Sequence, residues 1–252
     1  MAAAPVLPGS PTPTPETAPL SQVARIINAF VAPSKTFTDL RRSASWWAPF
    51  LLTALISCAL VYVAGQKIGF AKIVENQMQS QPKAEARFEK LTPEQREQQI
   101  KWTGISYYVI IPVFTLIIWL VVAAFQFATF KFGANADITY SRSLAVVAYG
   151  GLPLAIKALL AAVSVLAGAS ADGFSMQNPV ATNPGYLLNP ADGVFLYSLA
   201  SALDLFMIWT LVLTAIGFTY AGKVKSTTAY VVVFGWWAVL TLAGAAIAGA
   251  FS

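Results

Sequence analysis

The sequence predicts an all-α integral membrane protein with five transmembrane helices and an N-terminal amphipathic helix. Of its 252 residues, 57% are hydrophobic and 11% are charged, whereas soluble domains carry about 25% charged residues. Five apolar stretches each approach the roughly 20 residues that a helix needs to cross the hydrocarbon core. None of them shows the sustained alternation of a barrel strand, so helices are the expected spanning elements.

The N-terminal part, before the first span, divides into two segments. Residues 1–20 contain six prolines and one charged side chain, Glu16, which predicts a disordered proline-rich tail instead of a cleaved signal peptide. Residues 21–45 predict two short cytoplasmic helices separated by Pro33. The first is amphipathic, because apolar residues recur at helical spacing between Leu20 and Val31 while Arg25 falls on the opposite side.

The second short helix leads into basic and aromatic residues that are typical of a membrane interface. Arg41 and Arg42 are followed by Trp46 and Trp47, the residue types that are enriched where headgroups meet water. The lipid bilayer is therefore an expected partner of residues 21–45. Packing on the protein's own cytoplasmic face is an alternative, and it is compatible with membrane contact.

The transmembrane domain is expected over residues 46–250, with an outer helical segment at 66–105. In that segment Thr92, Pro93 and Glu94 form a helix-start signature, and residues 81–91 also have a helical pattern. A helical hairpin or cap and a solvated charged run are both compatible with this pattern. The predicted spans are Trp47–Gly65, Tyr107–Phe130, Ser143–Gly168, Val194–Tyr220 and Ala229–Ala250.

Lysine and arginine in the flanks predict the orientation. Three flanking segments on one side contain eight basic residues: Arg25, Lys35, Arg41, Arg42, Lys131, Arg142, Lys223 and Lys225. On the other side, residues 169–193 contain none. The expected arrangement is a multi-pass protein of the plasma (inner) membrane with a cytoplasmic N-terminus and an outer C-terminus. Segment 66–105 also carries basic residues, and we place it outside because long segments follow the rule less strictly.

Two ionisable residues, Lys157 and Asp204, fall inside the predicted spans. Each lies about 11 residues, or about 16 Å, from the outer end of its helix, so neighbouring antiparallel helices would bring them level. A structural salt bridge is the favoured interpretation. A proton or ion path, or a contact with a partner subunit's charge, is the alternative. With a salt bridge, replacing Asp204 alone with Ala is expected to be more damaging than replacing both residues.

The third and last spans contain features of helix geometry. Gly150, Gly151 and Pro153 predict a break in the third span. No second span carries a recognisable break at a matching position, which favours packing over a transport site. Small residues in the last span predict a close-packing face within the bundle or between protomers; they are Gly244, Ala245, Ala248 and Gly249.

Catalysis is not expected. The sequence has no histidine and one cysteine, Cys58, which removes the commonest general base and the commonest metal ligand. It has no phosphate-binding loop, nucleophile elbow or cysteine pair, so neither a cofactor nor a metal site is predicted. The positive net charge is explained by the membrane flanks, and nucleic acid is not an expected partner.

Two segments resemble the YIP (Ypt-interacting protein) domain family. The segment ARIINAFVAPSKTFTDLRRSASWWAPFLL is similar to the family's opening, and RSLAVVAYGGLPLAIKALL is similar to its third span. The residues that carry the resemblance are Phe30, Pro33, Thr36, Phe37, Trp47, Pro49, Tyr149 and Pro153. The resemblance covers about residues 21–250 and implies five spans with a cytoplasmic N-terminus.

The resemblance also bears on function. Eukaryotic members bind small GTPases, but their acidic-aromatic motif before the first span is missing here, so GTPase binding is not carried over. The alanine-rich composition looks more like the bacterial branch, whose members are suspected accessory subunits near transporters. We therefore expect a non-enzymatic partner-binding or membrane-organising subunit, with other membrane subunits or a second copy as partners. The alternative is a small transporter or channel component that uses Lys157 and Asp204.

Overall fold

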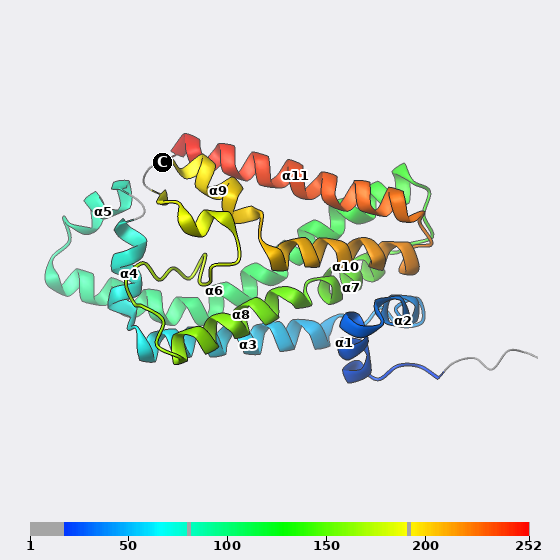
Figure 1. Cartoon of the computed structure of the whole chain (residues 1–252), viewed down its shortest axis with the longest axis horizontal. Coiled ribbons are helices and arrows are strands. Elements are labelled where there is room, and N and C mark those ends of the chain that lie inside the picture. Colours follow the sequence, from blue (N-terminus) through cyan, green and yellow to red (C-terminus); the bar gives the residue numbers. More distant parts are fainter. Residues whose placement is uncertain (1–17, 80–81, 191–192, 252) are drawn as a thin grey trace, which may run out of the picture.

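A computed structural model of the chain describes residues 18–79, 82–190 and 193–251, so most of the predicted proline-rich tail lies outside the described residues. Within these ranges the protein is helical and has no β-strand (Figure 1). The elements are α1 (Gln22–Val31), α2 (Pro33–Asp39), α3 (Trp47–Lys67), α4 (Phe70–Gln79), α5 (Pro82–Phe88), α6 (Pro93–Ala128), the π-helical turn η1 (Thr129–Gly133), α7 (Tyr140–Gly150), α8 (Leu152–Leu166), the 3₁₀ turn η2 (Pro184–Leu187), α9 (Val194–Ala202), α10 (Leu205–Ala221) and α11 (Ser226–Phe251).

Among the described residues, four helical segments are long and apolar enough to cross a membrane, and a bent pair makes a fifth span when the two helices are counted together. The four are Trp47–Lys67, Pro93–Gly133, Tyr140–Leu166 and Ser226–Ala250; the bent pair is α9 with α10. The predicted fold class is thereby confirmed. Figure 1 places α1 and α2 at one end of the bundle, and α4, α5 and the C-terminus at the other. We call these the α1–α2 end and the α4–α5 end.

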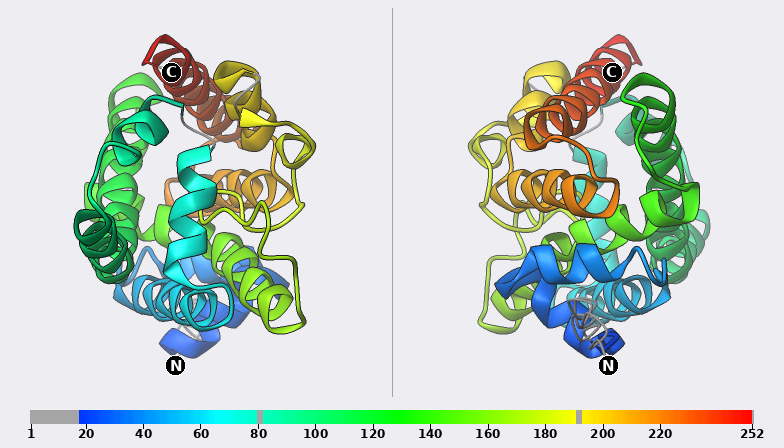
Figure 2. Two further views of the ribbon diagram at one scale, coloured as in Figure 1. Left: turned by 90° about the vertical axis from the view of Figure 1, so that its left-hand side faces the viewer. Right: turned by 90° about the vertical axis from the view of Figure 1, so that its right-hand side faces the viewer.

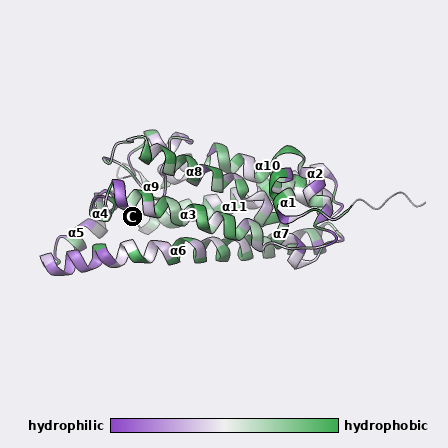
Figure 3. Ribbon diagram, turned by 90° about the horizontal axis from the view of Figure 1, so that it is seen from below, coloured by the Kyte–Doolittle hydropathy of each residue, from purple (hydrophilic) through white to green (hydrophobic). Residues whose placement is uncertain are grey.

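The second span begins well before its predicted start at Tyr107. Thr92 accepts a hydrogen bond from the Gln95 amide, and the Gln95 side chain accepts one from the Thr92 amide. This capping box starts a helix that continues without interruption into the membrane-spanning part. The Thr92–Pro93–Glu94 signature therefore marks the start of the same helix that forms the second span, and α6 projects beyond its neighbours at the α4–α5 end as a hydrophilic extension (Figure 3).

The core lies where α10 packs against both α2 and α7, near the α1–α2 end. The side chains of Phe37 and Leu40 are fully buried there, together with Tyr149 and Phe218. A β-carbon on Gly217 would lie 2.5 Å from Val146 and 2.9 Å from the Phe37 ring, so only glycine allows this approach. The two short N-terminal helices thus contribute side chains to the core. In the end-on views of Figure 2 they lie along one edge of the bundle.

The two broken spans differ in kind. In the third span α7 ends at Gly150 and α8 begins at Leu152, so the interruption is Gly151 alone and the pair still forms one span of 27 residues. The fourth span, predicted as an unbroken helix, is bent by 53° between α9 and α10. That prediction was wrong because the chain leaves the helix at Leu203 and Asp204 and starts a new one with Asp204 as its N-cap.

We expect Gly150→Ala to destabilise the protein by about 1–3 kcal/mol, because overpacking forces rigid neighbours apart. A β-carbon there would lie 2.3 Å from the Thr214 hydroxyl and 3.1 Å from the Thr214 α-carbon. Gly235→Ala is the control, since no atom lies within 4 Å of its β-carbon position. Thermal unfolding in detergent should show a lower midpoint for Gly150→Ala alone. Equal midpoints would contradict the close α7–α10 contact.

Candidate functional site

Asp204 occupies the break in the fourth span and caps the helix that follows. Its Oδ1 accepts hydrogen bonds from the Phe206 amide at 2.9 Å and the Met207 amide at 3.3 Å. These are two of the amides that a helix start leaves without intrahelical partners. The residue is 3% exposed. Its carboxylate therefore satisfies backbone donors that would otherwise be buried without partners.

The second carboxylate oxygen of Asp204 joins three further segments. Oδ2 accepts from the Lys157 Nζ of α8 at 2.7 Å. It also accepts from the Thr182 hydroxyl and, at 3.1 Å, from the Asn183 side-chain amide. The structure thus brings Lys157 and Asp204 together, with both carboxylate oxygens fully engaged. The side chains of this pair are 16% and 4% exposed.

The loop between α8 and α9 folds back into the bundle to reach this site. Asn178 and Asn183 exchange two side-chain hydrogen bonds, of 3.2 and 2.7 Å. The Thr182 carbonyl accepts from the Leu205 amide at 3.1 Å, which fixes the loop beside the break. A β-carbon on Gly185 would lie 2.1 Å from the Ser201 hydroxyl, so the loop also touches α9 directly.

Thr182 and Asn183 were not predicted as site residues. The sequence contains one signal that points toward them, since Asn-Pro occurs three times in the loop, at residues 178–179, 183–184 and 189–190. Asn-Pro pairs favour turns, and a loop with three turns folds back more readily than an extended one. Which of its polar side chains meets Asp204 depends on the tertiary fold.

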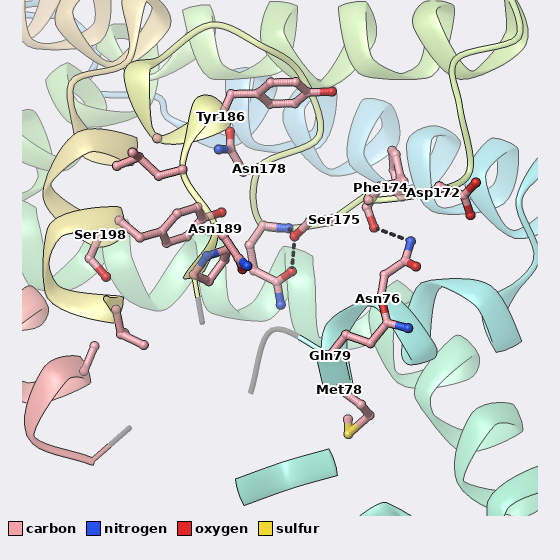
Figure 4. Close-up of a pocket in the computed structure, with 18 of the residues that line it drawn as sticks. Asn76, Met78, Gln79, Asp172, Phe174, Ser175, Asn178, Tyr186, Asn189 and Ser198 are labelled. Atoms are coloured by element: carbon pink, nitrogen blue, oxygen red, sulfur yellow. Dashed lines mark hydrogen bonds between the residues drawn. The ribbon is translucent and has the colours of Figure 1, made fainter. Parts of the chain in front are cut away.

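A cavity of about 1290 Å³ lies at the α4–α5 end, next to this network. Figure 4 shows Asn76 and Gln79 of α4 on one side, Asn178 and Tyr186 of the loop on another, and Ser198 of α9 beyond them. Amide, hydroxyl and aromatic side chains dominate its described lining. Asn178 and the backbone at Gly185 line it, but Lys157 and Asp204 are not among the described lining residues.

Helix α4, in segment 66–105, is joined by hydrogen bonds and an ion pair to the same loop. Asn76 donates to the carbonyls of Ala171 at 2.8 Å and Phe174 at 3.1 Å. Lys72 lies 3.1 Å from the Asp172 carboxylate, and the pKa of Lys72 is raised, first by its hydrogen bond to Asp172. Residues 68–79 and 169–175 are therefore neighbours at one end of the bundle, as the predicted topology requires.

The predicted small-residue face divides into two parts. Ala245 is 2% exposed, and a β-carbon on Gly249 would lie 3.2 Å from Phe195, so this pair packs against α9. Gly244 has no atom within 4 Å of its β-carbon position, and Ala248 lines the cavity. Among the described residues, Gly244 and Ala248 are therefore not packed against another helix in the way that Ala245 and Gly249 are.

The α1–α2 end contains a second buried ion pair that the sequence did not predict. Arg25 Nε lies 2.7 Å from Asp39 Oδ2, and both residues are buried. Arg25 also donates to the Ser43 carbonyl at 3.0 Å. Arg25 was expected on the solvent side of an amphipathic helix and as an orientation charge, but the structure turns it into the protein. The two residues lie on different helices, so helical periodicity gave no signal for this pair.

The remaining predicted residues lie at the surface of the same end. Arg41 and Arg42 are exposed in the turn after α2, and Trp47, at the first position of α3, is 53% exposed. Trp46 is partly buried against Phe50, at 6.0 Å between ring centroids. Among the described residues no three His, Cys, Asp or Glu side chains lie together in a manner that could hold a metal ion.

The comparison with protein families decides which family this fold represents. The family model described as Yip1 domain matches residues 27–247, from the second half of α1 to near the end of α11, and this range includes the Asp204 site. The chain belongs to the Yip1 family. It is therefore a multi-pass membrane protein of that family, and the resemblance seen in the sequence is confirmed. No curated protein and no solved structure matches it.

In this Yip1 protein we expect Asp204→Asn to destabilise by about 3–5 kcal/mol, because it leaves the Lys157 ammonium buried without a counter-charge. Asn is more informative than Ala here, since it keeps an oxygen that can cap α10. Adding Lys157→Met should recover much of the loss, as measured by thermal unfolding in detergent.

The control for this comparison of single and double variants is Lys72→Met, which breaks an ion pair with the exposed Asp172 carboxylate. It should lower the free energy of unfolding by no more than about 1 kcal/mol. A double variant no more stable than Asp204→Asn would show that the Lys157 charge contributes nothing to the effect.

Proposed function

We propose that this Yip1 protein is a non-enzymatic, partner-binding subunit of the membrane, which holds a transmembrane helix of another subunit or of a second copy between α6 and α11. The observation that carries this proposal is the divergence of these two helices. They meet at the α1–α2 end and separate toward the α4–α5 end (Figure 1).

The contact between α6 and α11 is confined to the end where they meet. The Phe125 and Trp236 rings pack at 4.6 Å between centroids, and the Trp236 indole donates to the Thr129 hydroxyl at 2.8 Å. At the opposite end Gln99 of α6 and Ala248 of α11 are both lining residues of the cavity. The two helices therefore form a V that opens toward the α4–α5 end.

The two helices of the V are also the least covered spans. In the most apolar 18-residue stretch of α6, 11% of the residues are buried inside the protein, and the value for α11 is also 11%. In the third span 61% are buried. Both helices carry exposed apolar side chains, such as Val113 and Phe114 on α6 and Ile247 on α11. The open pair Gly244 and Ala248 adds a position where another helix backbone could approach closely.

The alternative, a transporter or channel component, has less support. A broken helix is a common element of transport sites, and the fourth span has one. However, both oxygens of Asp204 are occupied by protein donors, and neither Lys157 nor Asp204 is among the described residues of the cavity lining. The pair is thus better suited to holding α8, the loop and α10 together than to binding and releasing an ion.

We further propose the plasma membrane as its location, with the α1–α2 end in the cytoplasm. The eight basic residues of the three flanking segments lie at this end, and the loop of residues 169–193 at the opposite end has none (Figure 1). Segment 66–105, also at the opposite end, carries seven basic residues, but long segments follow the rule less strictly. The alanine-rich composition supports a bacterial member of the family. No acidic-aromatic motif precedes the first span, so small GTPases are not proposed as partners.

Site-specific photo-crosslinking in native membranes tests the partner-binding function. A photoreactive benzoyl-phenylalanine at Gly244, where no atom crowds the β-carbon position, should yield a discrete adduct of higher mass. The matched control is the same residue at Leu159 of α8, an exposed apolar position on another span. An adduct of twice the chain's mass would identify a second copy as the partner. Lipid adducts alone at both positions would contradict the proposal.

A further inference from the structure

Helix α1 has three sides with different surroundings. The first, with Arg25 and Ala29, is buried against the protein. The second carries Val23, Ile27 and Val31, which are 66%, 55% and 74% exposed. The third carries Asn28, which is partly exposed and lies about 100° around the helix from Ile27. Because Val23, Ile27 and Val31 are spaced four residues apart, they form one continuous apolar stripe along the helix.

Polar contacts fix which side of α1 faces the protein. The Arg25–Asp39 ion pair, at 2.7 Å, connects α1 to α2, and the Thr36 hydroxyl donates to the Arg25 carbonyl at 2.8 Å. The Tyr149 hydroxyl of α7 donates to Gln22 Oε1 at 2.7 Å. These polar contacts anchor α1 together with Ala29, Ile26 and Phe30, which pack on the core, and the Val23–Ile27–Val31 stripe points away from the bundle.

The level of α1 along the bundle follows from its contacts with the start of α3. Gln22 Nε2 donates to the Ser45 hydroxyl at 3.1 Å, two residues before α3 begins at Trp47. With 21 residues, α3 is about as long as the hydrocarbon core is thick. Its exposed Trp47 therefore marks one edge of that core, as interfacial tryptophans do. The stripe lies near this edge.

We propose that the Val23–Ile27–Val31 stripe is inserted into the bilayer leaflet at the α1–α2 end, between the lipid headgroups and the acyl chains. The exposed Arg41 and Arg42 of the same end match anionic headgroups in charge. The bilayer covers the stripe, while the ion pair and the Tyr149 contact set its orientation. The helix is then a permanent wedge in one leaflet, because its position depends on the protein and not on reversible folding at the membrane.

Spin-label depth measurements test this insertion. Cys58→Ala removes the single native cysteine, and Ile27→Cys and Asn28→Cys then carry a nitroxide in nanodiscs of three parts phosphatidylcholine to one part phosphatidylglycerol. The Ile27 label should be accessible to oxygen and protected from a water-soluble nickel chelate, at a depth of about 5–10 Å below the phosphates. The Asn28 label should be accessible to the chelate, and a label at Leu159 calibrates the acyl-chain region.

Two results would overturn the insertion. Chelate access at Ile27 equal to that at Asn28 would mean that the stripe faces water. Low access of both oxygen and chelate at Ile27 would mean that protein covers it, whether another part of this chain or a partner. This test does not depend on the V between α6 and α11, so its failure leaves the proposed function untouched.

Discussion

The carboxylate of Asp204 is the group on which the arrangement of the second half of the chain depends. Inside a membrane every backbone donor must find a partner within the protein, so a helix can be interrupted only where other groups take over its hydrogen bonds. Asp204 provides these groups with Oδ1, and with Oδ2 it connects α8 and the loop to the same point. Charge neutralisation by Lys157 makes its burial tolerable.

This arrangement has consequences for the end of the bundle that carries the cavity. Since the loop is drawn into the bundle at Thr182 and Asn183, it can receive Asn76 of α4 on its other side. The bend also turns α9 toward α11, where Ala245 and Gly249 permit close packing. Part of the cavity wall is therefore formed by elements, the loop and α9, whose positions follow from the one broken helix.

At the α1–α2 end, the buried Arg25–Asp39 ion pair joins two short helices instead of stabilising a break in a span. Arg25 and Asp39 hold two short helices against the core, where Phe37 and Leu40 of the α2 region are buried together with residues of α7 and α10. Because the side of α1 that carries Arg25 and Ala29 faces inward, Val23, Ile27 and Val31 are left for the surroundings. Both ends thus use buried charge to fix non-spanning segments, and both leave apolar surfaces of the spans, or of α1, outside the protein core.

The sequence by itself determined the fold class, the number of spans and the presence of two charges at membrane depth. Hydropathy is sufficient for this, because the bilayer requires long apolar helices whatever their packing. The Gly150–Pro153 segment was also visible, since glycine and proline act on the local backbone. The family resemblance rested on residues such as Phe37 and Tyr149, which lie in the core.

Only the tertiary structure decided the break at Asp204, the hydrogen bonds of Thr182 and Asn183, the Arg25–Asp39 pair and the direction of α1. An aspartate can cap a new helix or form an ion pair within a continuous one, and the choice depends on whether a loop and a lysine reach it. Helical periodicity likewise places Arg25 on the same side of α1 whether that side faces solvent or the protein. Such choices depend on contacts between residues distant in sequence, which no local pattern records.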